Sequence, residues 1–289
     1  MGFCNQEFKS AFYQKNFMST YAVIGDPIDH SLSPNIHSAA FRELNLEHSY
    51  IAYRIPRDEL EEGIEALKKI NIAGFNVTIP HKVEMMKFLD KIDETCSVVG
   101  AVNTVSNENG VLKGYNTDMD GFLEPLRKRN IPIQGTKILL LGSGGAARGI
   151  VAGLVKEKAR TITIANRTID NARKLSEFAQ KFGLESNFIK IDEVGESANQ
   201  YNIIVNATSI GLKNEPSPIS LNTVNEKTVV YDIVYMPINT DFLKKAKTKN
   251  ATIIYGYEML LEQAAKAFEI WHGMKAPYNA MKRALLGGV

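Results

Sequence analysis

The sequence has little cysteine, little excess charge and no long apolar run. Its only cysteines, Cys4 and Cys96, are too far apart to indicate a disulfide framework or a zinc site. The formal net charge is +2 and the basic residues are scattered, which argues against a nucleic-acid or membrane surface. No apolar run approaches the ~20 residues that cross a bilayer. We therefore expect a cytoplasmic protein whose partners are small molecules.

Histidines in a metal-ligand arrangement are also lacking. The five histidines form no HxxxH-type pair: His30, His37, His48, His81 and His272. Closely spaced histidines on one helix face are what a typical zinc enzyme would need. The sequence therefore predicts no metal ion.

The first 18 residues do not match the rest of the chain. They lack the uninterrupted apolar core and small-residue cleavage site of a secretory signal, so export is not indicated. Met18 immediately precedes the first strand-like run. We expect residues 1–18 to be a leader outside the fold, with translation starting at Met1 or at Met18.

The length of 289 residues and the composition, 44% hydrophobic and 23% charged, indicate two globular domains. Strands and helices alternate in the first third, which favours a small α/β domain with a mainly parallel sheet. The expected strands are 21–25, 49–55 and 74–79. One expected helix ends near residue 44, and two others span 58–70 and 83–89. The predicted substrate domain covers 19–118 and is completed by C-terminal helices within 258–289 that pack back on it.

The middle of the chain predicts a second, Rossmann-type domain over 119–257. A helix at 118–130 ends before Pro132 and Gly135, and a new series of strands and helices begins at 137. The expected strands are 137–141, 161–165, 202–206, 229–233 and 252–254. One expected helix ends near residue 158, and the next spans 169–182. This order is typical of a doubly wound nucleotide-binding sheet.

A glycine-rich turn follows the strand KILLL. Gly142, Gly144 and Ala147 satisfy the GxGxxG/A pattern, and a helix follows. Such a turn lets the backbone approach a pyrophosphate, which the positive end of the helix dipole then stabilises. The alternative is a tight turn with no ligand, but the strand before the turn and the helix after it favour dinucleotide binding.

The end of the next strand indicates which dinucleotide binds. An NAD enzyme places Asp or Glu there to bind the ribose hydroxyls, whereas this sequence has Asn166, Arg167 and Thr168. A guanidinium with polar neighbours suits the 2′-phosphate of NADP. An exposed arginine near a helix N-cap is the alternative. The position favours NADP.

Small polar residues gather at strand ends in the first third of the chain. They lie in Ser31–Ser33, Asn76–Lys82, Asn103–Thr104 and Asn116–Asp118. Hydroxyls, amides, an ammonium and a carboxylate are what a polyhydroxylated acid needs when it leaves water. Lys82 near a carboxylate could exchange a proton with a reacting oxygen, although most lysines are solvated surface charges and Asp118 could merely cap a helix.

These stretches together resemble the shikimate dehydrogenase (shikimate/quinate dehydrogenase) family from about Tyr21 to the C-terminus. The matching motifs are IGDPIDHSLSP, GFNVTIPHK, GAVNTV, GYNTDMDG, GSGGAAR, ANRT, NATSIG, DIVYMPINTDFL and GYEMLLEQAAKAFEIWHG. The resemblance implies an NADP-dependent oxidoreductase that reversibly reduces 3-dehydroshikimate to shikimate, on the route to chorismate and the aromatic amino acids.

The resemblance also implies roles for individual residues. The implied catalytic residues are Lys82 and Asp118. The implied substrate-binding residues are Ser31, Ser33, Asn76, Thr78, Lys82, Asn103, Asp118, Tyr235 and Gln263. The implied cofactor-binding residues are Gly142, Ser143, Gly144, Gly145, Ala146, Asn166, Arg167, Thr168, Asn206, Ala207, Thr208, Ile233, Gly256 and Met259. For Gly256 and Met259, a helix start and a helix core are the simpler interpretations.

Three alternatives stay open. A quinate/shikimate dehydrogenase of relaxed specificity could use NAD, although Arg167 argues against that. A noncatalytic shikimate-binding regulator would be expected to lack the lysine and aspartate. An amino-acid or folate dehydrogenase with similar domains would not explain SLSP and NVTIPHK. The sequence leaves a homodimer possible.

Overall fold

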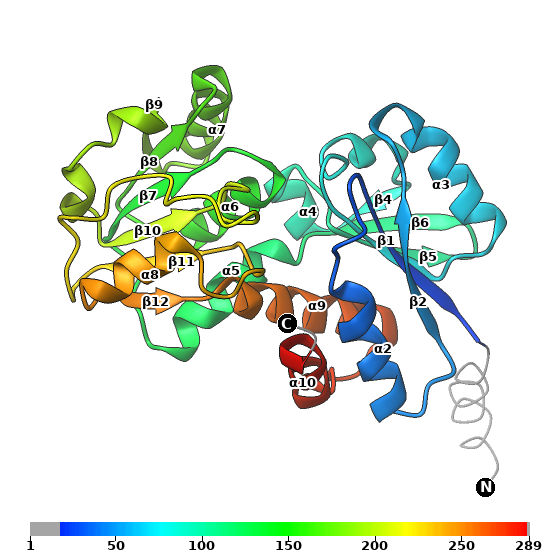
Figure 1. Cartoon of the computed structure of the whole chain (residues 1–289). Coiled ribbons are helices and arrows are strands. Elements are labelled where there is room, and N and C mark those ends of the chain that lie inside the picture. The colour runs from blue at the N-terminus through cyan, green and yellow to red at the C-terminus, as the bar shows by residue number, and fades with distance from the viewer. Residues whose placement is uncertain (1–17, 288–289) are drawn as a thin grey trace, which may run out of the picture.

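The computed structural model describes residues 18–287 as two α/β lobes, each built on a six-stranded sheet (Figure 1). Of the expected leader, 1–17 lie outside the described residues. Met18 is exposed. The elements of the first lobe lie at one side of the molecule and those of the second lobe at the other, with α4, α5 and α9 between the two sheets (Figure 1).

The sheet of the first lobe has the order β2-β1-β3-β5-β6-β4. Its strands are β1 (Thr20–Gly25), β2 (Ser49–Arg54), β3 (Gly74–Val77), β4 (Lys91–Ile92), β5 (Thr104–Glu108) and β6 (Val111–Tyr115). β1 is parallel to β2 and β3, and β4 is parallel to β6, but β5 runs antiparallel to β3 and β6. The sheet is thus mainly parallel, with an antiparallel hairpin that the sequence analysis did not predict.

The sheet of the second lobe has the order β12-β11-β10-β7-β8-β9, with every pair parallel. Its strands are β7 (Lys137–Leu141), β8 (Thr161–Asn166), β9 (Glu185–Lys190), β10 (Ile203–Asn206), β11 (Val229–Asp232) and β12 (Thr252–Ile254). The chain runs outward from β7 to β9 and then from β10 to β12 on the other side. The strand order therefore reverses between β7 and β10, where doubly wound sheets bind their ligands. The Rossmann-type prediction is confirmed.

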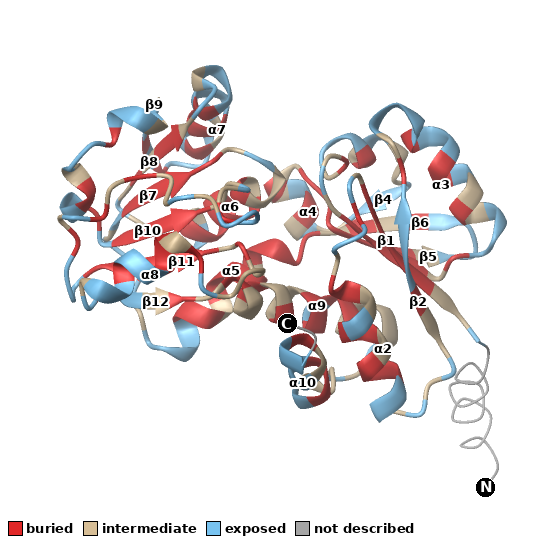
Figure 2. Cartoon of the chain, in the orientation of Figure 1, coloured by how far each residue is buried: buried red, intermediate tan, exposed pale blue. Residues whose placement is uncertain are grey.

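Helices cover both sheets (Figure 2 shows their buried faces). They are α2 (Ser33–Glu43), α3 (Leu60–Lys69), α4 (Glu94–Val99), α5 (Asp118–Lys128), α6 (Gly145–Lys156), α7 (Ile169–Lys181), α8 (Asp241–Thr248), α9 (Gly256–His272) and α10 (Tyr278–Gly287). The expected helix at 83–89 is instead a short 3-10 helix, η3 (Glu84–Phe88), which ends where Leu89 becomes extended. The helices α4 and α8 were not predicted from the sequence.

The C-terminal helices return to the first lobe as predicted. α9 packs along α5, and α10 packs on α2. Phe268 of α9 and Met281 of α10 are fully buried in one cluster with Tyr21 and Phe41 of the first lobe. A paired hydrogen bond between Arg129 and Glu258, at 2.7 and 2.9 Å, joins the start of α9 to the end of α5. The chain thus crosses between the lobes at least twice.

His37 is a polar residue inside this aromatic cluster. Its ring is fully buried and stacks on Tyr50 with centroids 4.5 Å apart, and neither ring nitrogen has a hydrogen-bond partner among residues 18–287. Burial, assisted by the nearby His272, lowers the pKa of His37 to about 3. The folded chain therefore binds fewer protons here than the unfolded chain between about pH 6.5 and pH 3, and stability falls as the pH drops through that range.

We expect His37→Phe to remove part of this acid sensitivity. Since the imidazole must stay neutral in the fold, wild type should lose about 2 kcal/mol at pH 5 relative to pH 7.5 through this residue. The difference in free energy of unfolding, variant minus wild type, should rise by about that amount as the pH falls over the same range. Urea unfolding at both pH values measures it, and pH-independent differences would show that His37 is not the titrating group.

Candidate functional site

Lys82 and Asp118 form a largely buried ion pair. Lys82 follows β3, and Asp118 is the first residue of α5, with Thr117 in the cap position. Lys82 Nζ donates to Asp118 Oδ2 at 2.5 Å, and their side chains are only 12% and 6% exposed. The peptide N–H of Val102 donates to the carbonyl of Lys82 at 2.8 Å, which holds the lysine segment against the neighbouring chain. Neither a solvated surface lysine nor a simple helix cap describes this arrangement.

Asn103 fixes the aspartate from the other side. Its Nδ2 donates to Asp118 Oδ1 at 3.0 Å and to Thr117 Oγ1 at 2.9 Å, while its Oδ1 accepts from the Thr117 peptide N–H at 2.7 Å. Gln263 Oε1, from α9, lies 3.4 Å from the same Nδ2. The C-terminal helix therefore brings its predicted substrate residue to the ion pair.

Asn76 extends this network toward the substrate-domain serines. Its Nδ2 donates to Thr104 Oγ1 at 3.0 Å, and its Oδ1 accepts from Tyr50 Oη at 2.6 Å. Tyr50 is buried, and burial raises its pKa, while a side-chain hydrogen bond with Ser33 opposes that rise. Tyr50 was not among the site residues predicted from the sequence. The one sequence feature that pointed to it was its place in a strand beside β1.

The remaining predicted substrate residues lie at the start of α2, after β3 and after β11. The Ser33 peptide N–H donates to Ser31 Oγ at 3.3 Å, so the two serines sit together at the start of α2. Tyr235, from the second lobe, packs against the first-lobe cluster that includes Leu32, and burial raises the pKa of Tyr235. Thr78 follows β3 and is half-buried. The structure thus brings residues of both lobes to one region.

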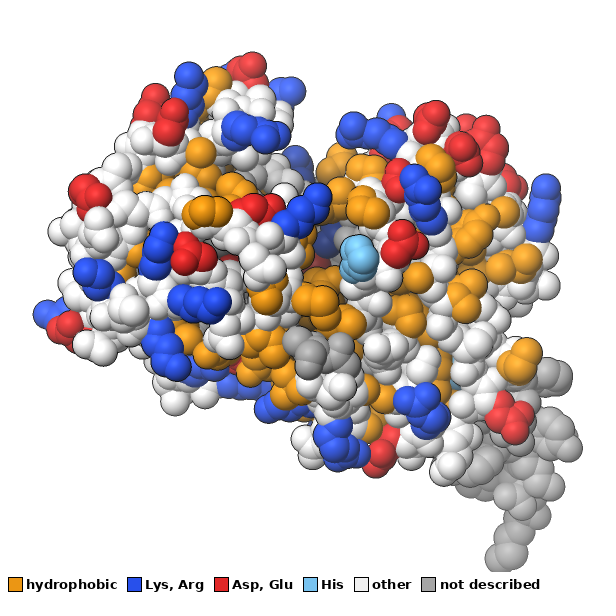
Figure 3. Space-filling model, in the orientation of Figure 1, with side chains coloured by type: hydrophobic (Ala, Val, Ile, Leu, Met, Phe, Trp, Pro, Cys, Tyr) orange, Lys and Arg blue, Asp and Glu red, His pale blue; other side chains and the backbone are white. Residues whose placement is uncertain are grey.

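Two glycines of α6 let the second lobe approach the ion pair. A Cβ atom added at Gly145 would lie 3.0 Å from Lys82 Cδ, and one added at Gly149 would lie 2.9 Å from Asp118 Cβ. The N-terminal turns of α6 therefore contact both members of the pair. From the sequence, Gly145 was predicted only as part of a phosphate-binding loop, and Gly149 was assigned no role. Figure 3 shows the surface hollowed between the two lobes.

Gly142 and Gly144 shape the turn between β7 and α6. Gly142 has a φ of +100°, and a Cβ atom there would lie 2.8 Å from the carbonyl oxygen of Ala207. Gly144 is exposed at the N-cap of α6, and a Cβ atom there would meet nothing within 4 Å. Ser143 and Ala146 are half-buried beside them. The open space at a helix N-terminus fits the pyrophosphate of a dinucleotide.

The end of β8 fits the 2′-phosphate of NADP. Arg167 is exposed and makes no side-chain hydrogen bond or ion pair with any other residue in 18–287. Asn166 Nδ2 donates to the carbonyl of Thr168 at 2.9 Å, which fixes the backbone on both sides of the arginine. Thr168 is exposed at the N-cap of α7. A guanidinium without a carboxylate partner is available to an anionic ligand.

The other predicted cofactor residues are less accessible. Asn206 is fully buried with its side chain fully hydrogen-bonded, so only the neighbouring Ala207 and Thr208 are partly exposed. Ile233 is half-buried after β11. A Cβ atom at Gly256 would lie 2.3 Å from the carbonyl oxygen of Val234, so the helix start needs glycine. Met259 is buried in a core cluster with Phe122, as a helix-core residue would be.

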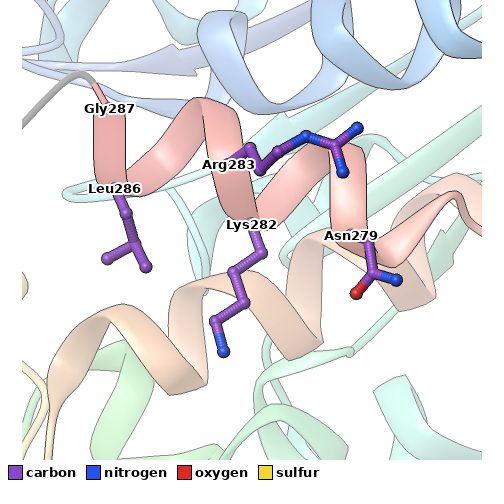
Figure 4. Close-up of a pocket in the computed structure, with 5 residues that line it drawn as sticks. All are labelled: Asn279, Lys282, Arg283, Leu286 and Gly287. Carbon is purple, nitrogen blue, oxygen red and sulfur yellow. The ribbon is translucent and has the colours of Figure 1, made fainter.

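Metal clusters and membrane-spanning helices are absent from the described part of the chain. Within 18–287, no three His, Cys, Asp or Glu side chains gather closely enough for a metal ion, and no helix is long and apolar enough to cross a membrane. A surface hollow is lined by α10 residues alone: Asn279, Lys282, Arg283, Leu286 and Gly287 (Figure 4). None of these residues takes part in the network around Lys82.

Comparison with known proteins matches the two lobes to one family. Three family models match: a shikimate dehydrogenase substrate-binding domain over 23–105, a shikimate/quinate 5-dehydrogenase over 126–234, and a shikimate 5′-dehydrogenase C-terminal domain over 256–286. The shikimate dehydrogenase (NADP(+)) of Nitrosopumilus maritimus strain SCM1 is 78% identical over 269 residues, covering 93% of this chain and 98% of that protein.

More distant relatives agree. The shikimate dehydrogenase (NADP(+)) of Bacillus subtilis strain 168 is 39% identical, over 92% of this chain and 96% of that protein. The crystal structure of shikimate 5-dehydrogenase from Thermus thermophilus, in complex with NADP(H) and shikimate, has a TM-score of 0.84 at 35% identity. That match covers 94% of this chain and all of that one.

Proposed function

The chain belongs to the shikimate dehydrogenase family, and we propose that Lys82 and Asp118 are the catalytic pair of its reaction. The protein is an NADP-dependent oxidoreductase that interconverts 3-dehydroshikimate and shikimate, a step of aromatic amino-acid biosynthesis. The observation that carries the assignment of the pair is the largely buried hydrogen bond between Lys82 Nζ and Asp118 Oδ2, next to the glycines of α6.

In this proposal Lys82 handles the proton at the reacting oxygen. During reduction, Nζ donates a proton to the C3 oxygen of 3-dehydroshikimate, and during oxidation it accepts the proton of the C3 hydroxyl. NADPH, when bound, supplies the hydride. Asp118 orients the ammonium through Oδ2 and binds a ring hydroxyl, while Asn103 keeps its carboxylate from rotating.

The polar shell binds the rest of the substrate. We assign the substrate carboxylate to Ser31, Ser33 and Tyr235. The two serines are hydrogen-bonded to each other at the start of α2, and Tyr235 packs against the hydrophobic cluster that includes Leu32 between them. The ring hydroxyls are assigned to Asn76, Thr78, Asn103 and Gln263. Asn76 and Asn103 are already oriented by hydrogen bonds inside the protein, so little side-chain entropy is lost on binding.

The cofactor set follows the second sheet. The pyrophosphate is assigned to the turn from Gly142 to Ala146, and the 2′-phosphate to Asn166, Arg167 and Thr168. The nicotinamide half is assigned to a set of residues near the ends of β10 and β11 and the start of α9: Asn206, Ala207, Thr208, Ile233, Gly256 and Met259.

Absorbance of reduced nicotinamide at a fixed enzyme concentration tests the function directly. The purified protein should reduce NADP⁺ in the presence of shikimate. Quinate and NAD⁺, run beside them, test the alternative of relaxed specificity. Absence of turnover with shikimate and NADP⁺, in a protein that is folded by circular dichroism, would contradict the assignment. Turnover also separates this enzyme from a noncatalytic shikimate-binding regulator.

Arg167→Ala should shift the cofactor preference. Because the unpaired guanidinium is assigned to the 2′-phosphate, its loss should raise the KM for NADP⁺ by roughly 10–100-fold, in line with a charge-assisted, partly bidentate contact. The KM for NAD⁺, which lacks that phosphate, should hardly change. Arg173→Ala, on the exposed face of α7 and paired with Glu177, is the matched control. Equal effects on the two cofactors would exclude this role for Arg167.

The rest of the proposal concerns the whole chain. We propose a substrate domain at 19–118 completed by 258–289, and a dinucleotide domain at 119–257, because each range holds one sheet and the C-terminal helices pack on the first.

We propose a cytoplasmic location, supported by the buried free thiol of Cys96. Light scattering of the purified protein distinguishes a monomer from the homodimer.

A further inference from the structure

Asp232 is a buried carboxylate outside the catalytic pair. It ends β11 with no exposed surface and forms no ion pair within 18–287. Its Oδ1 accepts from Asn206 Nδ2 and from the Val234 peptide N–H, each at 3.0 Å, and its Oδ2 accepts from Thr240 Oγ1 at 2.6 Å. Burial raises the pKa of Asp232 to about 6, against these three hydrogen bonds. Burying a carboxylate without a neighbouring cation costs free energy of folding, and this cost calls for an explanation.

One branch of this network leads to the cofactor turn. Asn206 uses its second Nδ2 hydrogen to bond the carbonyl of Ile210 at 3.1 Å, and its Oδ1 accepts from the peptide N–H and the hydroxyl of Thr208, at 3.1 and 2.6 Å. All hydrogen-bonding positions of Asn206 are thus used inside the protein. The turn that they fix packs against Gly142, whose missing Cβ would lie 2.8 Å from the carbonyl oxygen of Ala207. Asp232 therefore acts on the phosphate loop through Asn206.

The second branch leads to the substrate segment. The Val234 N–H that Asp232 binds directly precedes Tyr235, which we assign to the substrate carboxylate. The same Val234 peptide packs on Gly256 at the start of α9, so it is fixed from both sides. Thr240, the third partner, caps α8 by accepting from the Leu243 N–H at 3.3 Å and closes the 233–240 loop. One carboxylate thus joins segments assigned to different ligands.

We propose that Asp232 is a positioning residue that holds the NADP-binding turn at 206–208 and the segment at 233–235, which carries the shikimate residue Tyr235, in a single arrangement. The proposal rests on the proposed function. Loss of the carboxylate leaves the buried donors of Asn206 and Val234 without an acceptor, so both segments move. The affinity for both ligands then falls together, whereas the Lys82–Asp118 pair, which belongs to other elements, keeps its geometry.

Steady-state kinetics of Asp232→Ala test this. We expect the KM for NADP⁺ and the KM for shikimate each to rise at least tenfold, while kcat at saturation of both stays within about threefold of wild type. Asp232→Asn keeps the shape and one acceptor oxygen, so it should restore most of both KM values. Asp241→Asn is the matched control, because that partly exposed carboxylate accepts from the Ser217 peptide N–H and pairs with Lys245 without joining the network.

Other outcomes overturn the proposal. It fails if a folded Asp232→Ala has unchanged KM values, if only one KM changes, or if kcat alone falls. If Asp232→Ala does not fold, Thr240→Val removes one of the three donors to Asp232, together with the side-chain cap of α8, and should raise both KM values severalfold. If wild type does not oxidise shikimate, the proposed function fails instead. Calorimetric titration of NADP⁺ into wild type and Asp232→Ala then decides whether Asp232 holds the cofactor turn, and equal affinities reject it.

Discussion

Lys82→Ala should lower kcat for shikimate oxidation by about three orders of magnitude, the range in which a positioned acid or base contributes to a rate. Lys82 Nζ, hydrogen-bonded to Asp118, is the group to which we assign proton transfer at the C3 oxygen, so the substitution removes that acid and base. The KM for shikimate should change far less, because the serine and asparagine residues to which we assign the rest of the substrate stay in place. Initial rates at saturating NADP⁺, over a range of shikimate concentrations, separate the two constants.

The variant also leaves the buried Asp118 carboxylate without its cation, which itself costs stability. Circular dichroism and thermal unfolding must therefore accompany the kinetics, and Lys82→Gln, which retains hydrogen-bond donors to Asp118, provides a second variant. Lys87→Ala is the control, since that lysine is exposed and pairs only with Glu84 in the same short helix. A folded Lys82→Ala enzyme with normal turnover would remove Lys82 from the mechanism.

The sequence located this pair but did not establish their contact. Lys82 and Asp118 were each placed at the end of a predicted strand or the start of a helix, where the connecting loops of an α/β sheet carry function. They are 36 residues apart, however, and the hairpin of β5 and β6 lies between them. That hairpin turns at Asn109 and Gly110, both with positive φ, and was not predicted. The distance between the two groups therefore depends on a pairing that local pattern did not reveal.

Elements with weak hydrophobic patterns were missed for a similar reason. β9 is an edge strand with Ser186 as its one buried residue, so alternation of apolar residues could not identify it. α8 has only eight residues, and α4 has six. By contrast, β7 and β11 are almost completely buried and were predicted nearly to the residue. The period of apolar residues reports burial against a core, and edges and short helices have little of it.

Site residues that act through the backbone were also beyond sequence patterns. Asp232 lies in the motif DIVYMPINTDFL, but nothing in that stretch shows that its partners are Asn206 and Thr240. Gly149 likewise reads as an ordinary helix glycine until its contact with Asp118 is known. Recognising a family placed these residues in motifs, whereas their roles in positioning came from three-dimensional contacts.

Gly144→Ala should raise the KM for NADP⁺ by roughly 10–100-fold while leaving the protein folded. A Cβ atom at this position would meet no protein atom within 4 Å, and its φ of −80° suits alanine, so the fold itself has room for the methyl group. The expected cost to stability is confined to a weaker helix N-cap, about 1 kcal/mol or less. The pyrophosphate, however, is assigned to this open space, where the backbone must be approached closely.

Gly144→Ala should weaken NADP⁺ binding without a large loss of protein stability, and a control variant separates these two effects. Gly287→Ala is the matched control, because a Cβ atom there also meets nothing within 4 Å, yet the residue lies on α10 away from the dinucleotide domain. The two variants should have similar unfolding temperatures, and only Gly144→Ala should bind NADP⁺ weakly in calorimetry. If Gly144→Ala binds NADP⁺ as wild type does, the space above the N-terminus of α6 is not where the pyrophosphate lies. The kcat with saturating NADP⁺ should fall much less than in Lys82→Ala, because Gly144 is assigned to the cofactor and Lys82 to the reacting oxygen.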